Sequence, residues 1–227
     1  MTNLKAVLKK AKADLTKRDT IREKAHDDMR KATSLSKQTI LLTHQKRFED
    51  AHKSLINAKE LISNLQDLAD EYPEIVFGGG MFSAALQEYS EANIFSRLVE
   101  ENRYVSPEEI NVPTVDFVLG LGDVVGELRR LSLDSLREGN VKKGEECLEI
   151  MDEIFIELMG LDEAYMLVPG LRHKSDTARR IIETTRGDIT QEVRRKALED
   201  YLRKFELQQL KPQQSEIKKV KPRKTKK

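Results

Sequence analysis

The spacing of apolar residues in the segment 48–72 constrains the fold of this chain more than any other feature. Small and aliphatic side chains recur there at three- and four-residue steps, at Ala51, Leu55, Ala58, Leu61, Ile62 and Leu65. This spacing places apolar side chains along one face of an α-helix. No segment shows the alternation of apolar and polar residues, bounded by turn residues, that predicts a β-strand. The pattern therefore predicts an all-α protein.

The composition supports the same fold class. The 227 residues are 38% hydrophobic, which is enough for one continuous core, and they include no tryptophan, 11 glycines and 6 prolines. Strong helix formers such as leucine, glutamate, lysine, arginine and alanine make up much of the chain. We expect residues 1–210 to form a single-domain bundle of about seven helices.

Turn and cap residues divide this bundle. We expect one long helix, or two nearly collinear ones, up to about residue 47, followed by helices over 48–72, 81–103, 114–137, 141–159, 170–186 and 188–210. Pro73 and the three glycines at 78–80 form the turn after the second helix. Ser106 predicts a short additional helix, because serine is a favoured N-cap and Pro107 suits the first helical position. Gly139 with Asn140 ends the helix over 114–137.

The charge of the chain is distributed unevenly. The net charge is +1, but residues 211–227 hold eight Lys/Arg and one Glu, which leaves 32 basic and 38 acidic side chains in the rest. A like-charged block with two prolines and few large apolar residues buries too little surface to fold, so we predict a disordered basic tail over 211–227. Such a tail either binds polyanions by counterion release or serves solubility alone.

The chain carries no sign of an oxidising compartment or a membrane. Cys147 is the single cysteine, so no internal disulfide is expected, which fits a reducing compartment. No apolar run approaches the roughly 20 residues that span a bilayer, and the N-terminus lacks the apolar core of a signal peptide. We expect a cytoplasmic protein.

Two of the predicted helices carry carboxylates among apolar residues. Glu88 and Glu91 stand three residues apart in the stretch ALQEYSEANIF. Asp116, Asp123 and Glu127 form an acidic stripe along the otherwise largely apolar helix over 114–137. Buried carboxylates are costly unless they are neutralised. Two such helices therefore suggest a converging site made of oxygen ligands, the alternative being a solvated acidic face.

The residue types narrow the chemistry of such a site. Oxygen ligands suit Mg²⁺ or Mn²⁺ rather than zinc, and carboxylate-held metals commonly activate water for phosphodiester cleavage. A di-iron bundle would need two Glu-x-x-His motifs, and only Glu23 with His26 fits. The motifs of serine hydrolases, phosphate-binding loops and zinc proteases do not occur. His44, on the apolar side of its helix, is interpreted as a core residue.

Three stretches resemble the translin family. They are SKQTILLTH (36–44), LQEYSEA (86–92) and VDFVLGLGDVVGELRRLSLDSL (115–136), and the resemblance extends from about residue 20 to 206. Within the family, the acidic set is more similar to the catalytic, TRAX-like members than to translin itself.

The resemblance implies a fold, an assembly and an activity. The fold is an all-α domain that assembles into a hollow octamer and binds RNA or single-stranded DNA, and TRAX-like subunits are Mg²⁺-dependent endoribonucleases. The matching residues make Glu88, Glu91 and Asp123 the expected metal ligands, with Glu127 as a fourth ligand or the general base. A homo-octamer is expected for a chain with a complete acidic set.

Basic residues are the expected contacts to RNA phosphates, and we select four of them: Lys37, Arg97, Arg129 and Arg130. The leading hypothesis is a Mg²⁺- or Mn²⁺-dependent endoribonuclease that cleaves single-stranded or processed RNA inside an oligomeric shell. A non-catalytic shell that binds RNA or single-stranded DNA is the main alternative. A helical scaffold for another protein is a third, and it predicts no salt-dependent affinity for nucleic acid.

Overall fold

The computed structural model describes residues 3–161, 163 and 165–209, and within these residues it contains helices and no strands. The helices are α1 (Leu4–His44), α2 (Phe48–Glu71), α3 (Pro73–Phe77), α4 (Met81–Glu101), α5 (Pro107–Ile110), α6 (Thr114–Arg137), α7 (Val141–Met159) and α8 (Leu171–Gln209). The predicted all-α class is confirmed. The predicted tail over 211–227 lies outside the described residues.

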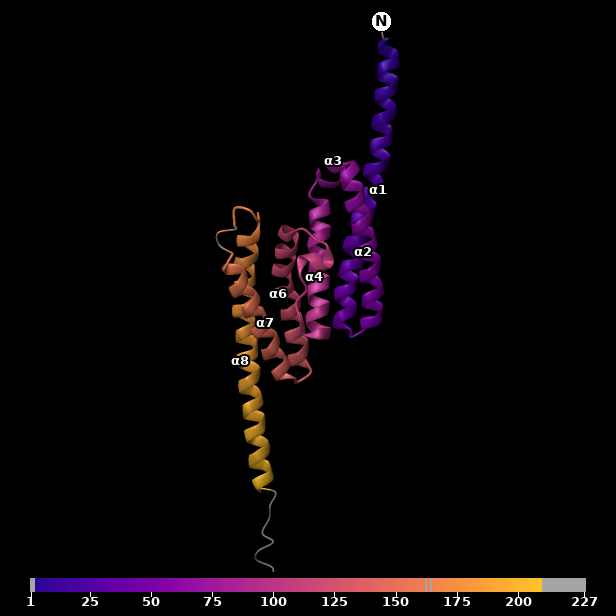
Figure 1. Ribbon diagram of the computed structural model, residues 1–227. Coiled ribbons are helices and arrows are strands. Elements are labelled where there is room, and N and C mark those ends of the chain that lie inside the picture. Colours follow the sequence, from indigo (N-terminus) through magenta and orange to yellow (C-terminus); the bar gives the residue numbers. More distant parts are fainter. Residues whose placement is uncertain (1–2, 162, 164, 210–227) are drawn as a thin grey trace, which may run out of the picture.

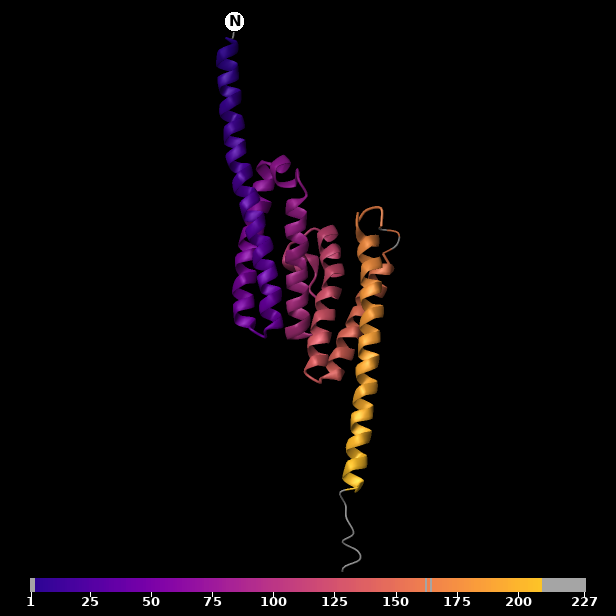
Figure 2. The same cartoon turned by 180° about the vertical axis from the view of Figure 1, so that it is seen from behind.

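The long helices stand side by side in a row, as two opposite views show (Figures 1 and 2). An antiparallel pair, α1 and α2, packs on α4; α4 packs on α6; and α6 packs on α7 and α8. One main cluster of buried side chains runs through this row. Since α4 lies between α1 and α6, side chains from all three helices can meet.

The ends of the helices follow from the cap residues. Ser106 Oγ accepts a hydrogen bond from the Glu109 backbone N–H at 3.3 Å and caps α5, as predicted. Asn140 Oδ1 accepts a hydrogen bond from Lys143 N at 3.1 Å and caps α7. Gly80 adopts a φ of 69° at the start of α4, a conformation that glycine tolerates at no steric cost.

Two predicted boundaries differ from the structure. The helices predicted over 170–186 and 188–210 are one continuous helix, α8. Gly187 lies inside it, and a Cβ at that position would have no neighbour within 4 Å. A glycine in a helix interior costs only about 1 kcal/mol relative to alanine, so the surrounding helix formers outweigh it. The turn after Tyr72 also contains the short helix α3, with Pro73 in its first turn.

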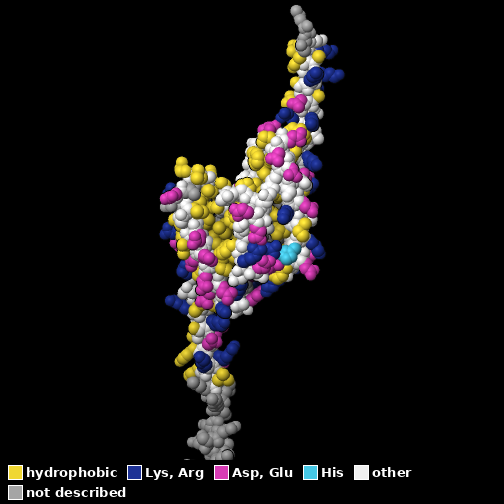
Figure 3. Space-filling model, viewed as in Figure 1, with side chains coloured by type: hydrophobic (Ala, Val, Ile, Leu, Met, Phe, Trp, Pro, Cys, Tyr) yellow, Lys and Arg dark blue, Asp and Glu magenta, His cyan; other side chains and the backbone are white. Residues whose placement is uncertain are grey.

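Two helices extend beyond the bundle in opposite directions (Figures 1 and 2). The buried residues of α1 begin only at Ala25, so its N-terminal half projects from one end. The second half of α8 is largely exposed and projects from the other end. Both projections mix charged side chains with exposed apolar ones (Figure 3), namely Leu4, Val7, Leu8 and Leu15 on α1 and Leu198, Tyr201, Leu202 and Phe205 on α8. None of the described helices is long and apolar enough to cross a membrane.

α4 and α6 approach each other closely at Gly120. A Cβ on this glycine would lie 2.6 Å from the backbone oxygen of Gln87, 2.7 Å from Cβ of Ser90 and 3.1 Å from the backbone nitrogen of Glu91. Two of these atoms belong to the α4 backbone, which cannot move aside as a side chain can. Glycine at position 120 is therefore required for the two helices to pack at this distance.

We predict that Gly120→Ala destabilises the protein by about 1–3 kcal/mol, the usual cost of overpacking, because α4 and α6 must separate. Gly126→Ala on the same helix is the matched control, since a Cβ there would have no neighbour within 4 Å. That variant should be as stable as the wild type, or about 1 kcal/mol more stable. Urea denaturation followed by circular dichroism measures both. Equal stabilities of the two variants would contradict the packing argument.

Candidate functional site

The contact at Gly120 brings the predicted acidic residues of α4 and α6 together. Gly120, Asp123 and Glu127 recur at three- and four-residue steps, so the two acids extend from the face of α6 that meets α4. Glu88 and Glu91 lie one turn apart on α4. Asp116 does not join them, because its carboxylate accepts a hydrogen bond from Ser83.

The pKa of Glu91 reflects the convergence of these carboxylates. The residue is 9% exposed, and its pKa is raised to about 8. Burial is the largest cause, followed by the negative charges of Asp123, Glu88 and Glu127, while Lys174 lowers the pKa. A carboxylate responds in this way to burial and to nearby like charges. Glu91 is therefore largely protonated at neutral pH unless a further positive charge enters the site.

Cationic side chains from α1, α6 and α8 partly neutralise the acids. Lys37 Nζ on α1 lies 3.2 Å from Glu88 Oε1, and Arg130 on α6 lies 3.8 Å from Glu127 Oε2. Lys174 on α8 donates a hydrogen bond to Asp123 Oδ2.

Lys174 reaches the acids across Gly122. A Cβ at Gly122 would lie 3.3 Å from both Cβ and Cδ of Lys174, so the glycine makes room for the aliphatic part of the lysine side chain. Reasoning from the sequence missed Lys174, because α8 begins 34 residues after α6 ends and no local spacing relates the two helices.

His44 also belongs to the site. As predicted, its side chain is buried, with 4% exposed, but it is more than a core residue, because its Nε2 lies 2.6 Å from Glu127 Oε2. The sequence contained a signal for this: His44 follows Lys37 by seven residues, two helical turns, so the two side chains share a face of α1.

Three of the four acids, but not Asp123, line a small polar cavity between α1, α4 and α6. Its volume is about 310 Å³, and it is lined by Lys37, Ile40, Leu41, Glu88, Glu91, Glu127 and Arg130. Carboxylate oxygens are the donors that Mg²⁺ and Mn²⁺ prefer, and Glu91 experiences three negative charges and one positive charge. By donor chemistry the residues therefore fit a hard divalent cation.

The side chains are not preassembled around an ion, however. In the described part of the chain, no three Asp, Glu, His or Cys side chains are grouped so that they could hold a metal. Glu88 and Asp123 are paired with Lys37 and Lys174 instead. A bound cation would have to replace these ammonium groups as the counter-charge.

The four selected basic residues divide into two groups. Lys37 and Arg130 line the acidic cavity. Arg129 points to α8, where its guanidinium bonds Thr185 Oγ1 at 2.7 Å and lies 3.0 Å from Asp188. Arg97 pairs with Glu101 on another face of α4. The structure thus brings two of the four to the acids, and RNA binding by any of them stays a prediction.

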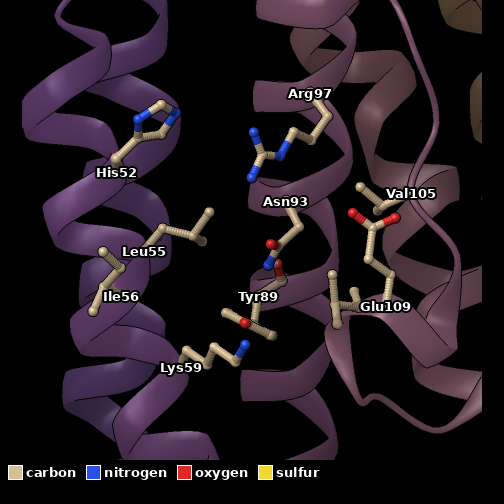
Figure 4. Close-up of a pocket in the computed structure, with 10 residues that line it drawn as sticks. His52, Leu55, Ile56, Lys59, Tyr89, Asn93, Arg97, Val105 and Glu109 are labelled. Atoms are coloured by element: carbon tan, nitrogen blue, oxygen red, sulfur yellow. Dashed lines mark hydrogen bonds between the residues drawn. The ribbon is translucent and has the colours of Figure 1, made fainter.

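A second cavity, of about 430 Å³, lies between α2, α4 and α5 (Figure 4). Its lining includes His52, Lys59 and Arg97. His52 is paired with Glu100, and Arg97 with Glu101, so two of its three basic side chains already have acidic partners. The lining of this cavity does not bring several carboxylates together, as the acidic site does.

The model of the translin family matches residues 20–184, most of the chain. The chain belongs to the translin family. The match includes α4 and α6, the two helices that carry the acids. The resemblance to the family expected from the sequence is therefore confirmed.

Relatives and solved structures agree with this assignment. An uncharacterised protein of Methanocaldococcus jannaschii is 31% identical over 195 residues, which cover 85% of this chain and 86% of that protein. The structure is similar to AfC3PO in its complex with duplex RNA, with a TM-score of 0.72 and 33% identity over 82% of this chain and 95% of that one. It also shares its fold with apo-NeC3PO, at a TM-score of 0.75 and 24% identity over 85% and 98% of the two chains. This fold is consistent with nucleic-acid binding.

The raised pKa of Glu91 predicts a pH dependence of stability in metal-free buffer. Below the ordinary pKa of 4.5, Glu91 is protonated in both the folded and the unfolded chain. Between pH 4.5 and about 8 the unfolded chain releases this proton while the folded chain retains it, so stability falls as pH rises and the loss is complete above about pH 8.

We expect Glu91→Gln, which cannot ionise, to remove this loss and to exceed the wild type in unfolding free energy at pH 8.5, by on the order of 2–4 kcal/mol. Urea denaturation at pH 5 and pH 8.5 measures the difference. Glu157→Gln, at an exposed position on α7, is the control and should keep the wild-type pH dependence. If the stability of Glu91→Gln fell with rising pH as much as that of the wild type, the prediction would be contradicted.

Proposed function

We propose that this translin-family protein is a Mg²⁺- or Mn²⁺-dependent endoribonuclease acting on single-stranded or processed RNA. The observation that carries the proposal is the convergence of four carboxylates from α4 and α6, close enough for three of them to raise the pKa of Glu91. A divalent cation would relieve that repulsion. Similarity to AfC3PO, which was solved with duplex RNA, supports RNA as the substrate.

Each residue has a role in this proposal. Glu88, Glu91 and Asp123 would hold the metal, which when bound polarises the phosphate and lowers the pKa of a water molecule. Lys37, Arg130 and Lys174, which neutralise the acids in the free protein, would contact phosphate oxygens in the complex. Such contacts recognise the backbone rather than the base sequence.

Glu127 is the proposed general base. Its two partners among the described residues, His44 and Arg130, both lie nearest Oε2, which leaves Oε1 to take a proton from the attacking water. The water oxygen forms a bond to phosphorus, the bond from phosphorus to the leaving ribose oxygen breaks, and that oxygen takes a proton from solvent. A general base must lie within hydrogen-bond reach of the proton that it removes.

A second candidate is a non-catalytic shell that binds RNA or single-stranded DNA. One observation favours it: Glu88 and Asp123 are both paired with lysines, as acids with a structural role would be. Assembly as a homo-oligomer, with an octamer as the expected size, is part of both proposals.

Cleavage of a fluorescently labelled single-stranded RNA distinguishes the two. We expect cutting with Mg²⁺ or Mn²⁺, none with EDTA, and a loss of at least about 100-fold in Asp123→Asn and in the double variant Glu88→Gln/Glu91→Gln, because each removes metal-binding charge. Filter binding should show that all variants retain RNA affinity within a few-fold.

Asp134→Asn is the matched control. Asp134 lies on the same helix as Asp123 but pairs with Arg137 on the surface, so this variant should cut at the wild-type rate. Tight binding without cutting by the wild type would favour the non-catalytic shell. Equal cutting by Asp123→Asn and the wild type would place the active site elsewhere.

A further inference from the structure

His44 connects α1 to the acidic site through one hydrogen bond. Its Nε2 lies 2.6 Å from Oε2 of Glu127, a residue 83 positions away in the chain. The histidine side chain is 4% exposed and that of Glu127 is 25% exposed. Glu127 thus lines the cavity, and the buried His44 contacts Glu127 from the side away from solvent.

Packing restricts the orientation of the His44 ring. The ring lies against Phe95 of α4, with 4.7 Å between the ring centroids and 38° between the planes. Phe95 is itself fully buried. Rotation of the imidazole would therefore disturb the contact between α1 and α4.

The second ring nitrogen shows what kind of role the histidine can have. Nδ1 is buried and has no hydrogen-bond partner among the described residues. A proton taken up at Nε2 could not be passed on through Nδ1, because no group in the described part of the chain receives it. This arrangement suits a fixed donor better than a proton relay. Neutral imidazole protonated at Nε2 donates to Glu127 and leaves only an acceptor unsatisfied at Nδ1.

We propose that His44 is the positioning residue for Glu127. Its Nε2–H donates to Oε2, and this bond directs Oε1 toward the cavity. The inference rests on the proposed nuclease function and deepens it, since it identifies what holds the general base in place. Partners of this kind, one shell away from the reacting groups, typically change metal affinity or activity by 10- to 100-fold when removed.

Kinetics test the role with three variants. His44→Phe keeps a ring against Phe95 but removes the donor, and it should lower kcat by about 10- to 100-fold with little change in KM for RNA, because the basic contacts to phosphate remain. His44→Gln keeps an amide N–H donor and should recover most of the loss. Thermal denaturation by circular dichroism checks that each variant is folded.

His52→Phe is the matched control. His52 makes the same type of pair, Nε2 to Glu100 at 3.0 Å, but it lies on α2 outside the acidic cavity. It should keep the wild-type kcat. A folded His44→Phe variant with the wild-type kcat would overturn the proposal, as would a His44→Gln variant no better than His44→Phe.

A second measurement is independent of activity. The chain has four histidines, so a spectrum of protein labelled with ¹⁵N-histidine is simple to assign. Glu127→Gln should shift the ring-nitrogen signals of His44 and leave those of the other three in place. Unchanged His44 signals would overturn the proposed contact. If the wild type cuts no RNA, the proposed function fails, and these signals still decide whether His44 holds Glu127.

Discussion

The close packing of α4 against α6 at Gly120 is the constraint on which the site depends. The acids lie within one or two turns of this glycine, so the distance between the helices sets the distance between the carboxylates. A larger residue would separate the helices and relax the repulsion that raises the pKa of Glu91. The packing that stabilises the bundle therefore also concentrates negative charge in one place.

This concentration of charge is balanced from several directions. Lys37 and His44 come from α1, Arg130 from α6 and Lys174 from α8. Lys37 contacts Glu88 and Lys174 contacts Asp123, whereas His44 and Arg130 both contact Oε2 of Glu127. No single helix could supply all of them. The free site is thus a network of polar contacts in which Glu88, Asp123 and Glu127 already have partners.

Much of the fold could be predicted from the sequence, because apolar spacing and cap residues act locally. Ser106 predicted α5, and Gly139 with Asn140 predicted the end of α6. Gly187 misled the prediction, because a single glycine weakens a long helix without ending it.

The acids of the site were predictable because each pair shares a helix face. Helical spacing could also have shown which of the selected basic residues on α6 lies beside the acids. Arg130 follows Glu127 by three residues and shares its face, whereas Arg129 follows by two and points nearly opposite. Lys174 could not have been found this way, since its approach to Asp123 depends on how α8 packs across α6. Whether a metal binds and how many subunits assemble likewise depend on contacts beyond the local sequence.

The projecting ends of α1 and α8 have a hydrodynamic consequence. With 41 and 39 residues, each helix is about 60 Å long at a rise of 1.5 Å per residue, and the two extend in opposite directions (Figure 1). A compact chain of this length has a radius of gyration of only about 17 Å. A single subunit therefore diffuses more slowly than a sphere of its mass and leaves a gel-filtration column early. Elution volume alone would count too many subunits, whereas light scattering measures mass without regard to shape.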